Sequence, residues 1–461
     1  MADNIVGSFR DPSGFLFKNA DSLFRQVNQT YQNDYDLLIG SGLYERLTKS
    51  GAMVSHEEVG LEVSPNPATV YKIIKPELIE FISYPYEWCF SQLKEAALLT
   101  LAIAKRSLDY GMSLKDASAY NVQFQNGRAV FIDTLSFEAY KEGEPWVAYR
   151  QFCQHFLAPL ALMVCRDVRL NQLLRVNIDG IPLDMAAKLL PFKTRLNFGL
   201  LTHIHLHAKS QQKYADRQIE GKLAKSNVNR NAIIGLLESL LSTVKKLELA
   251  SVKTDWTDYY QDTNYSSDAF DSKKEVIKSL LSIANPKMVW DLGANTGEFS
   301  RIASDQGIFT VAFDIDPGAV FDNYQLVKAN KEKNILPLIM DLTNPSPSLG
   351  WHHQERQSLL ERGPVDLAMA LALVHHLAIG NNVPLNAIAD FLADICKFLI
   401  IEFIPKSDSQ VKRLLSSRED IFPNYTINGF ETAFEDRFKV IEIKSVKESK
   451  RILYLMEKNN F

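Results

Sequence analysis

MVWDLGANTGEFSRIA, residues Met288–Ala303, is the stretch that decides the fold of the C-terminal part of this chain. Its apolar start predicts a buried strand that carries Asp291 near its end, and the amphipathic pattern that resumes afterwards predicts a helix. Gly293 allows the backbone to turn sharply between the two, and Gly297 allows a ligand to approach the first turn of the helix. The N-terminus of that helix is expected to present free N–H groups and a partial positive charge to an anionic group.

The spacing of this turn departs from both familiar phosphate-binding motifs. Asn295 stands where a GxGxxG fingerprint requires its second glycine, and no Lys-Ser/Thr pair follows Gly297 as it does in a P-loop. The part of the ligand held at this turn is therefore expected to be a carboxylate rather than a pyrophosphate.

The region from about residue 272 onward alternates strand-like and helix-like segments, which is the pattern of an α/β domain. Five continuous apolar runs suit central strands that are covered on both faces. These runs are MVWDL (288–292), TVAFDI (310–315), LPLIM (336–340), DLAMALAL (366–373) and FLIIEF (398–403). Two further runs, 438–443 and 452–456, have the spacing of a terminal hairpin, whereas a nicotinamide dehydrogenase would continue with parallel crossovers.

Two more acids are predicted at the carboxyl ends of the second and third strands, where the ligands of α/β proteins bind. Asp314 lies at a position from which an acid accepts hydrogen bonds from ribose hydroxyls, and Asp341 is a candidate partner for an adenine amino group. Each acid alone is compatible with an exposed loop carboxylate. Together with Asp291 they place three acids at the ends of successive strands, which indicates a nucleoside site.

These motifs resemble those of a known enzyme family. Val289–Gly297, Asp314 and Asp341-Leu342 resemble the first three motifs of class I S-adenosylmethionine-dependent methyltransferases, and the closing hairpin is similar to that family's antiparallel seventh strand. The resemblance covers about residues 272–461 and implies a Rossmann-like sheet with S-adenosylmethionine as the cofactor. Asn295 replaces a frequent glycine of the family, a departure that Asn tolerates because it adopts unusual backbone angles. The cofactor-binding residues that the resemblance implies are Asp291, Gly293, Asn295, Gly297, Asp314, Asp341 and Leu342.

Methyl transfer from a sulfonium is an in-line displacement, for which the protein supplies alignment and a water-poor pocket. A hydroxyl or amine acceptor also calls for a base. The fourth strand runs into ALALVHHL, which by the resemblance puts His375 and His376 close to where the family's methyl group lies. They are candidates for the base or for positioning the acceptor, and Glu402 at the end of the fifth strand is a third. The alternative for the histidines is that they cap the strand and pack. Residues 370–374 contain no Asn/Asp-Pro-Pro-aromatic motif, which disfavours adenine N6 and glutamine as acceptors.

The N-terminal half contains LKDASAYNVQFQNGRAVFIDTLSFE, in which Asp116, Asn121 and Asp133 resemble the catalytic loop and metal-binding acid of kinase-like and aminoglycoside-phosphotransferase-like folds. In that chemistry the first acid orients a hydroxyl, while the Asn and the second acid hold magnesium. Lys72 is the candidate for the lysine on a strand.

This N-terminal pattern departs from the kinase-like one at several points. Leu114 stands where a His is usual, Thr134-Leu135 replace the Phe-Gly that follows the metal acid, and no glycine-rich loop precedes Lys72. Three alternatives therefore remain: a degenerate kinase-like domain of α+β type, an active phosphotransferase, or ordinary turn chemistry of Asp and Asn.

Two other groups of residues have candidate roles. His203, His205 and His207 would share one face of a strand, as metal ligands do, but no acid or cysteine close by completes a site, so a structural role is expected. The resemblance also implies that tyrosines before the first strand of the methyltransferase-like region are candidates for covering the cofactor, with a merely packed or exposed aromatic segment as the alternative. They are Tyr259, Tyr260 and Tyr265.

Length and charge bound these interpretations. At 461 residues the chain is too long for one ordinary core, and its net charge of −4 does not favour nucleic acid as a partner. Four scattered cysteines and an N-terminus without signal-peptide features favour the cytoplasm. The longest apolar run, 156–165, is about half a membrane span, so no membrane association is expected.

We therefore expect an N-terminal accessory domain (1–215), a connecting helical segment (216–271) and a methyltransferase domain (272–461). The basic stretch 222–253 is expected to be the solvated face of the connecting helix, with contact to RNA or an acidic partner as the alternative. The chain as a whole resembles bacterial nodulation-type methyltransferase-like proteins, which implies a small-molecule or glycan acceptor. The alternatives are a bifunctional kinase–methyltransferase and a non-catalytic cofactor-binding protein, and the acceptor atom and oligomeric state remain open.

Overall fold

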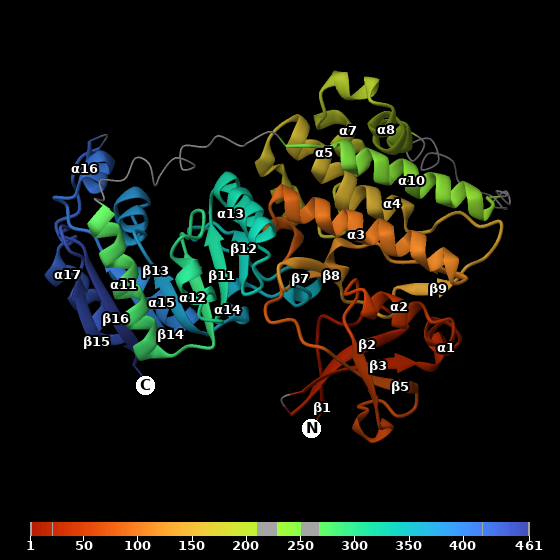
Figure 1. The fold of residues 1–461 in the computed structure, drawn as a ribbon, viewed down its shortest axis with the longest axis horizontal. Helices are drawn as coiled ribbons and strands as arrows, with labels where there is room; N and C mark the ends of the chain where they lie inside the picture. Colours follow the sequence, from red (N-terminus) through yellow and green to blue (C-terminus); the bar gives the residue numbers. More distant parts are fainter. Residues whose placement is uncertain (1, 21, 210–227, 250–266, 417, 460–461) are drawn as a thin grey trace. The chain divides into compact units, whose positions relative to one another are not determined.

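The structure is a computed structural model that describes residues 2–20, 22–209, 228–249, 267–416 and 418–459. The chain divides into two compact units (Figure 1). Unit 1 comprises Met1–Ala250 and Leu349–Arg356, and unit 2 comprises Ser251–Ser348 and Gln357–Phe461.

Unit 2 is built on a seven-stranded sheet with the order β12-β11-β10-β13-β14-β16-β15. The strands are β10 (Met288–Leu292), β11 (Phe309–Asp314), β12 (Ile335–Ile339), β13 (Val365–Ala370), β14 (Cys396–Phe403), β15 (Phe438–Ser445) and β16 (Ile452–Lys458). The first five are parallel, while β16 pairs antiparallel with both β14 and β15. The expected parallel sheet with a closing hairpin is therefore confirmed. The order reverses beside β10, because the chain runs outward through β11 and β12 and then returns to β13.

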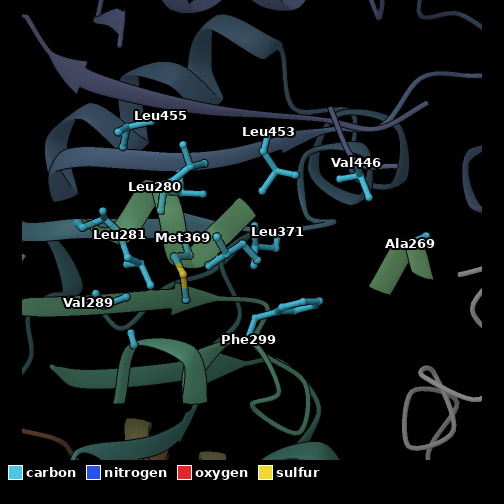
Figure 2. Close-up of a cluster of buried hydrophobic side chains, with 14 residues drawn as sticks. Ala269, Leu280, Leu281, Val289, Phe299, Met369, Leu371, Val446, Leu453 and Leu455 are labelled. Atoms are coloured by element: carbon cyan, nitrogen blue, oxygen red, sulfur yellow. The ribbon is translucent and has the colours of Figure 1, made fainter. Parts of the chain in front are cut away.

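Helices connect these strands and cover the sheet. They are α11 (Ser267–Ala284), α12 (Ser300–Ser304), α13 (Pro317–Asn330), α14 (Leu359–Arg362), α15 (Leu385–Ile395), α16 (Ser409–Leu415) and α17 (Ile427–Glu435). Figure 2 shows how α11 covers one face of the sheet, since its Leu280 and Leu281 lie in one core cluster with Val289, Met369 and Leu455 of three different strands. Strands β11 and β12 are buried at every position, as their uninterrupted apolar sequences predict.

Unit 1 begins with a five-stranded antiparallel sheet of order β1-β2-β3-β5-β4. Its strands are β1 (Ala2–Asn4), β2 (Gly14–Asn19), β3 (Ser22–Asn28), β4 (His56–Val59) and β5 (Val70–Pro76). Two helices, α1 (Gln32–Gly40) and α2 (Leu43–Lys49), lie between β3 and β4 in the chain. This separation of an antiparallel sheet from helices fits the expected α+β class.

The rest of unit 1 is mainly helical, with two short strand pairs. The pairs are β6 (Met112–Leu114) with β9 (Phe137–Ala139), and β7 (Val122–Gln125) with β8 (Arg128–Phe131). The helices are α3 (Phe90–Asp109), α4 (Tyr149–Phe152), α5 (Ala158–Cys165), α6 (Leu173–Val176), α7 (Leu183–Leu189), α8 (Phe198–Leu200) and α10 (Arg230–Lys246). Among the described residues, no helix combines the length and the apolar character that crossing a membrane requires.

The helix expected to connect the domains is part of unit 1 instead. Helix α10 packs against α3, where the Lys94 ammonium donates to the Leu247 carbonyl at 2.7 Å and Lys105 pairs with Glu238 at 2.9 Å. Unit 1 consequently extends to Ala250 rather than ending near residue 215. Much of the predicted connecting segment, with Lys222, Lys225 and Lys253 of the basic stretch, lies outside the described residues.

One short segment that follows β12 in the chain belongs to unit 1. Within Leu349–Arg356, Glu355 accepts two hydrogen bonds of 2.7 Å from the Arg10 guanidinium, and Arg356 lies 4.0 Å from the centre of the Tyr120 ring. His352 and His353 of this segment are exposed.

Candidate functional site

The turn after β10 is fixed by backbone hydrogen bonds and left-handed residues. The Gly293 and Ala294 N–H groups both donate to the Phe313 carbonyl of β11 at 2.9 Å. Gly293 and Asn295 have φ values of 80° and 49°, so Asn295 adopts the unusual backbone angle that was expected of it. Gly293 is exposed, and the atom nearest to the position of an added Cβ is a Leu373 methyl carbon at 3.5 Å. This side of the turn is therefore open.

Gly297 serves packing rather than ligand access. Its φ is 82°, and an added Cβ would lie 2.5 Å from the Asn323 amide nitrogen and 2.6 Å from an Arg301 nitrogen. Its N–H donates to the Ala294 carbonyl at 2.9 Å, and α12 begins only at Ser300. The structure thus differs from the expectation that Gly297 opens the first helical turn to a ligand, because protein side chains take that space.

Asp291 is a buried carboxyl that fastens β10 to α12. It accepts a hydrogen bond of 2.6 Å from the Ser300 hydroxyl, and its burial raises its pKa to about 7. Because its side chain has almost no exposed surface, Asp291 stabilises the turn through its contact with Ser300.

Asp314 joins the end of β11 to the turn after β10. Its carboxylate accepts the Asn295 N–H at 2.7 Å and the Asp316 N–H at 2.9 Å. Burial raises its pKa to about 6, although these two hydrogen bonds act in the opposite direction. The carboxylate is consequently held in one orientation at the tip of the strand.

The side chains near Asp314 include an apolar one that the sequence analysis missed. Ile315, which follows the acid directly, is 56% exposed, and Leu342 and Leu373 are partly exposed. Asp341 is also partly exposed and accepts the Thr343 N–H at 2.8 Å. The sequence did contain a signal for the exposure of Ile315. This apolar residue directly follows the acid that ends β11 and precedes α13, so neither element buries it.

Glu402 is part of a buried ion pair rather than an open catalytic carboxylate. It is fully buried and accepts a hydrogen bond of 2.7 Å from the Lys273 ammonium, which is 1% exposed. Its Oε2 also accepts the Ala372 N–H at 2.8 Å. Ala372 has a φ of 50°, an unfavourable left-handed angle for a residue with a Cβ, so this hydrogen bond stabilises the chain reversal after β13.

Other charges complete this buried network. Arg451 lies 3.9 Å from Glu402 and pairs with Asp408 at 2.9 Å, while Lys273 lies 4.4 Å from the centre of the Phe299 ring. Desolvation lowers the Lys273 pKa, against the opposing effect of Glu402. Lys273 was not predicted from the sequence, although this lysine lies on the apolar stripe of α11, at helical spacing from Phe270 and Ile277.

The two candidate histidines differ in exposure. His375 is completely buried, and within the described part of the chain neither ring nitrogen has a hydrogen-bond partner. Desolvation is the main reason that its pKa lies well below 6.5, so the ring is neutral. His376 is partly exposed, with burial lowering its pKa to about 4. Of the two, only His376 has exposed surface.

In unit 1, Asp116, Asn121 and Asp133 lie together, but their hydrogen bonds are made within the protein. Asp133 pairs with the Arg25 guanidinium of β3 and accepts a hydrogen bond of 2.5 Å from the Ser136 hydroxyl, to which the Asn121 amide donates at 3.1 Å. Burial, followed by the charge of Asp133, raises the Asp116 pKa.

Arg25 was missed by the sequence analysis, which chose Lys72. Arg25 also pairs with Asp11 at 3.2 Å, so it lies between two carboxylates. Lys72 lies on β5 and pairs with Glu58 of β4 at 2.6 Å. Asp133, which resembles the metal-binding acid of kinase-like folds, is thus contacted by an arginine of β3.

The remaining candidates either contact other side chains of the protein or lie outside the described residues. His203, His205 and His207 lie in a helical segment, where His203 contacts the Tyr149 hydroxyl at 2.8 Å and His207 stacks on the Tyr149 ring. Among the described residues, no group of three His, Cys, Asp or Glu side chains has the geometry to hold a metal. Tyr259, Tyr260 and Tyr265 lie outside the described residues.

The buried ion pair makes a testable prediction about stability. Glu402→Gln leaves the Lys273 ammonium buried without its counter-charge, so unit 2 should lose about 3–5 kcal/mol of unfolding free energy. Hydrogen exchange of peptides from β10, β13 and β14 in the full chain measures this loss separately from unit 1. The double variant Lys273→Met/Glu402→Gln removes both charges and should recover most of the loss. A Glu402→Gln variant with unchanged exchange rates would contradict the role given to the pair.

Comparison with known proteins identifies a relative of the chain. No protein-family model matches it. Nodulation protein NoeA of Rhizobium meliloti (strain 1021) is 34% identical over 464 residues, which span 99% of this chain and 96% of that protein.

Solved structures with some similarity include magnesium protoporphyrin IX methyltransferase (ChlM) from Synechocystis PCC 6803, at 16% identity and a TM-score of 0.30 over 44% of this chain and 89% of that one. The N-methyltransferase NodS from Bradyrhizobium japonicum WM9 is 10% identical with a TM-score of 0.30, over 42% of this chain and 99% of that one. WbdD is 18% identical with a TM-score of 0.30, over 45% and 43%. The chain belongs to the NoeA family, because it is 34% identical to NoeA over nearly its full length. Its second unit has the strand order of class I methyltransferases.

Proposed function

We propose that the chain is an S-adenosylmethionine-dependent methyltransferase that acts on a small-molecule or glycan acceptor through unit 2. The observation that carries this proposal is the order reversal of the sheet beside β10, with Asp314 held at the tip of the adjacent strand β11. In open α/β sheets ligands bind at such a reversal, outside the carboxyl ends of the strands.

The described residues fit this cofactor. The exposed side of Gly293 leaves room at the turn, and the Asp314 carboxylate is oriented to accept hydrogen bonds from ribose hydroxyls. Exposed Ile315 and partly exposed Leu342 offer apolar surface to an adenine ring, with Asp341 beside them for its amino group. When bound, the cofactor supplies an electrophilic methyl group. The protein's part is to align the acceptor with it and exclude water.

His376 is our candidate for contact with the acceptor. It is neutral at pH 7 because its pKa is lowered to about 4, so a ring nitrogen can accept a hydrogen bond from an acceptor hydroxyl or amine. Glu402 acts through other groups, since it holds Lys273 and the Ala372 N–H. It is a positioning residue for the loop that carries His376. His375 is enclosed and has no surface to offer a substrate.

For unit 1 we propose a kinase-like fold without phosphotransfer activity. The order of its first sheet, the helices between β3 and β4, and the grouping of Asp116, Asn121 and Asp133 support the kinase-like assignment. In active kinases the strand-three cation is a lysine and the second acid binds magnesium. Here Arg25 bonds to that acid directly, and Ser136 takes up its other oxygen. These residues do not fit a magnesium site, so we derive no phosphotransfer step.

Cofactor affinity should depend on Asp314 and on pH. Calorimetric titration of the full chain with S-adenosylmethionine should give a micromolar-range Kd, and Asp314→Asn should weaken it by about 1.5–3 kcal/mol, roughly 10- to 150-fold, through loss of a charged acceptor. Because burial raises the Asp314 pKa to about 6, the ionised form is lost as the pH falls through 6, and affinity should fall with it.

Asp314→Asn also serves as the control for this pH dependence. The variant keeps Asp291, whose pKa of about 7 lies in the same range, and Asp316, whose charge faces Asp314. Any pH dependence that survives in the variant does not come from Asp314. Equal affinities and equal pH profiles for both proteins would contradict the ribose assignment.

The turnover number kcat should distinguish the role of His376 from that of His375. His376→Ala should lower kcat for methyl transfer to hydroxyl- or amine-bearing saccharides by about 10²–10⁴-fold if the imidazole assists proton removal, and His376→Gln should retain part of it. Neither change should move the cofactor Kd. The matched control His375→Leu should keep activity, because the buried ring makes no hydrogen bond with the described residues that it could lose. Equal kcat in wild type and His376→Ala would remove His376 from the reaction.

Unit 1 should neither bind nor hydrolyse Mg·ATP. We expect the wild-type chain to show no shift of its unfolding temperature with Mg·ATP and no phosphate release, since Arg25 already neutralises Asp133. Asp116→Asn should behave identically. Phosphate release that disappears in Asp133→Ala would instead establish the bifunctional kinase–methyltransferase.

A further inference from the structure

A segment of unit 1, made of a short 3-10 helix (Phe192–Leu196), Asn197 and the first residue of α8, presents large apolar side chains to solvent. Phe192, Leu196 and Phe198 are 74%, 84% and 77% exposed, and they fall within seven consecutive residues. Single exposed apolar residues are ordinary on protein surfaces, but a cluster of this kind marks an interaction site. We call Phe192–Phe198 the apolar loop.

The apolar loop is held in place by polar residues, so the exposure of its apolar side chains is built into the fold. Thr194 is its one buried residue, and its hydroxyl bonds to the Pro191 carbonyl at 2.7 Å and contacts the His205 ring at 2.8 Å. Asn197 caps the following helical segment by accepting the Leu200 N–H at 3.1 Å. The backbone is therefore anchored without burial of any large side chain of the loop.

The charge around the apolar loop is predominantly positive. Residues 180–209 contain four basic side chains, Lys188, Lys193, Arg195 and Lys209, against the single acid Asp184. Lys188, Arg195 and Lys209 line a cavity of about 290 Å³ together with Asp184, Phe192 and Leu206, and Lys188 pairs with Asp184 at 3.8 Å, so the lining keeps a net positive charge. His205, which also lines the cavity, has a pKa lowered by burial and by two of these cations, so it adds no charge at pH 7.

We propose that the apolar loop and the cation-lined cavity beside it form a docking surface for an anionic lipid bilayer. Phe192, Leu196 and Phe198 would enter the boundary between head groups and acyl chains, while Lys193 and Arg195 between them pair with lipid phosphates. Interleaved aromatic, leucine and basic side chains on an anchored loop suit the polarity gradient of this boundary.

The composition favours a membrane over a protein partner. Three of the four cations are lysines, a residue type that is depleted in protein–protein interfaces because its charge is strongly hydrated. At a bilayer surface that hydration is largely retained, and each lysine or arginine still attracts anionic lipid. The attachment would be peripheral, since no helix among the described residues could span a membrane, and it departs from the expectation drawn from the sequence that the chain has no membrane association.

Vesicle co-sedimentation of the full chain tests this surface. We expect binding to vesicles of phosphatidylcholine mixed with phosphatidylglycerol, much weaker binding to phosphatidylcholine alone, and a decrease with added salt. The triple variant Phe192→Ser/Leu196→Ser/Phe198→Ser should bind at least tenfold less, and Lys193→Gln and Arg195→Gln about fivefold less each. Unfolding temperatures should not change, because these side chains are exposed.

Matched controls are available in unit 1. Leu78→Ser and Val147→Ser remove apolar side chains that are 58% and 63% exposed but lie outside the apolar loop, and they should leave vesicle binding unchanged. Equal binding to both kinds of vesicle, or a triple variant that binds like wild type, would overturn the proposal. So would a wild-type oligomer in solution that the triple variant dissociates, because the surface would then belong to contacts between copies of the chain.

Discussion

The buried ion pair between Lys273 and Glu402 is the constraint on which the arrangement of unit 2 depends. Taking two charges out of water costs several kcal/mol for each ion, a cost that is offset only by good geometry and further hydrogen bonds. Glu402 meets both conditions, since it lies 2.7 Å from the Lys273 ammonium and accepts the Ala372 N–H. One carboxylate thus joins α11, the end of β14 and the reversal after β13. Were it apolar, the left-handed Ala372 would lose its hydrogen bond and the following loop its fixed course.

The acids of the proposed cofactor site illustrate preorganisation of a different kind. Asp291 is directed inward to Ser300 and supports the turn, whereas Asp314 is directed by two backbone N–H groups and remains at the strand tip. Burial disfavours the ionised form of both, which is why their pKa values rise to about 7 and about 6. Hydrogen-bond donors from a ligand would stabilise the ionised Asp314. Its carboxylate needs no reorientation for this, so little entropy is lost on binding.

The sequence predicts unit 2 far better than unit 1, and the reason is physical. Strands β10 to β14 are buried on both faces, so their apolar runs differ from the observed strands by at most a few residues. The first sheet of unit 1 is partly solvated and its strands are short, as the pattern of β4 shows, with no fully buried position. Such strands carry little periodic signal. Contacts at long range escape the sequence for another reason. Arg25 and Asp133 are 108 positions apart, and no local pattern joins them.

Lys273 shows the intermediate case, in which a local pattern signals a site but not its partner. A lysine on the apolar stripe of an amphipathic helix is expensive to bury, so a counter-ion is required. Helical spacing from Phe270 and Ile277 identifies the position, but only the fold brings Glu402 to it. The same reasoning bears on unit 1. There Arg25 pairs with both Asp11 and Asp133, so in the proposed kinase-like fold the second acid is held by an arginine side chain rather than by a metal. On the proposal that unit 1 lacks phosphotransfer activity, it contributes through its surface rather than through chemistry. The anchored, cationic apolar loop is the part of that surface with the clearest physical purpose.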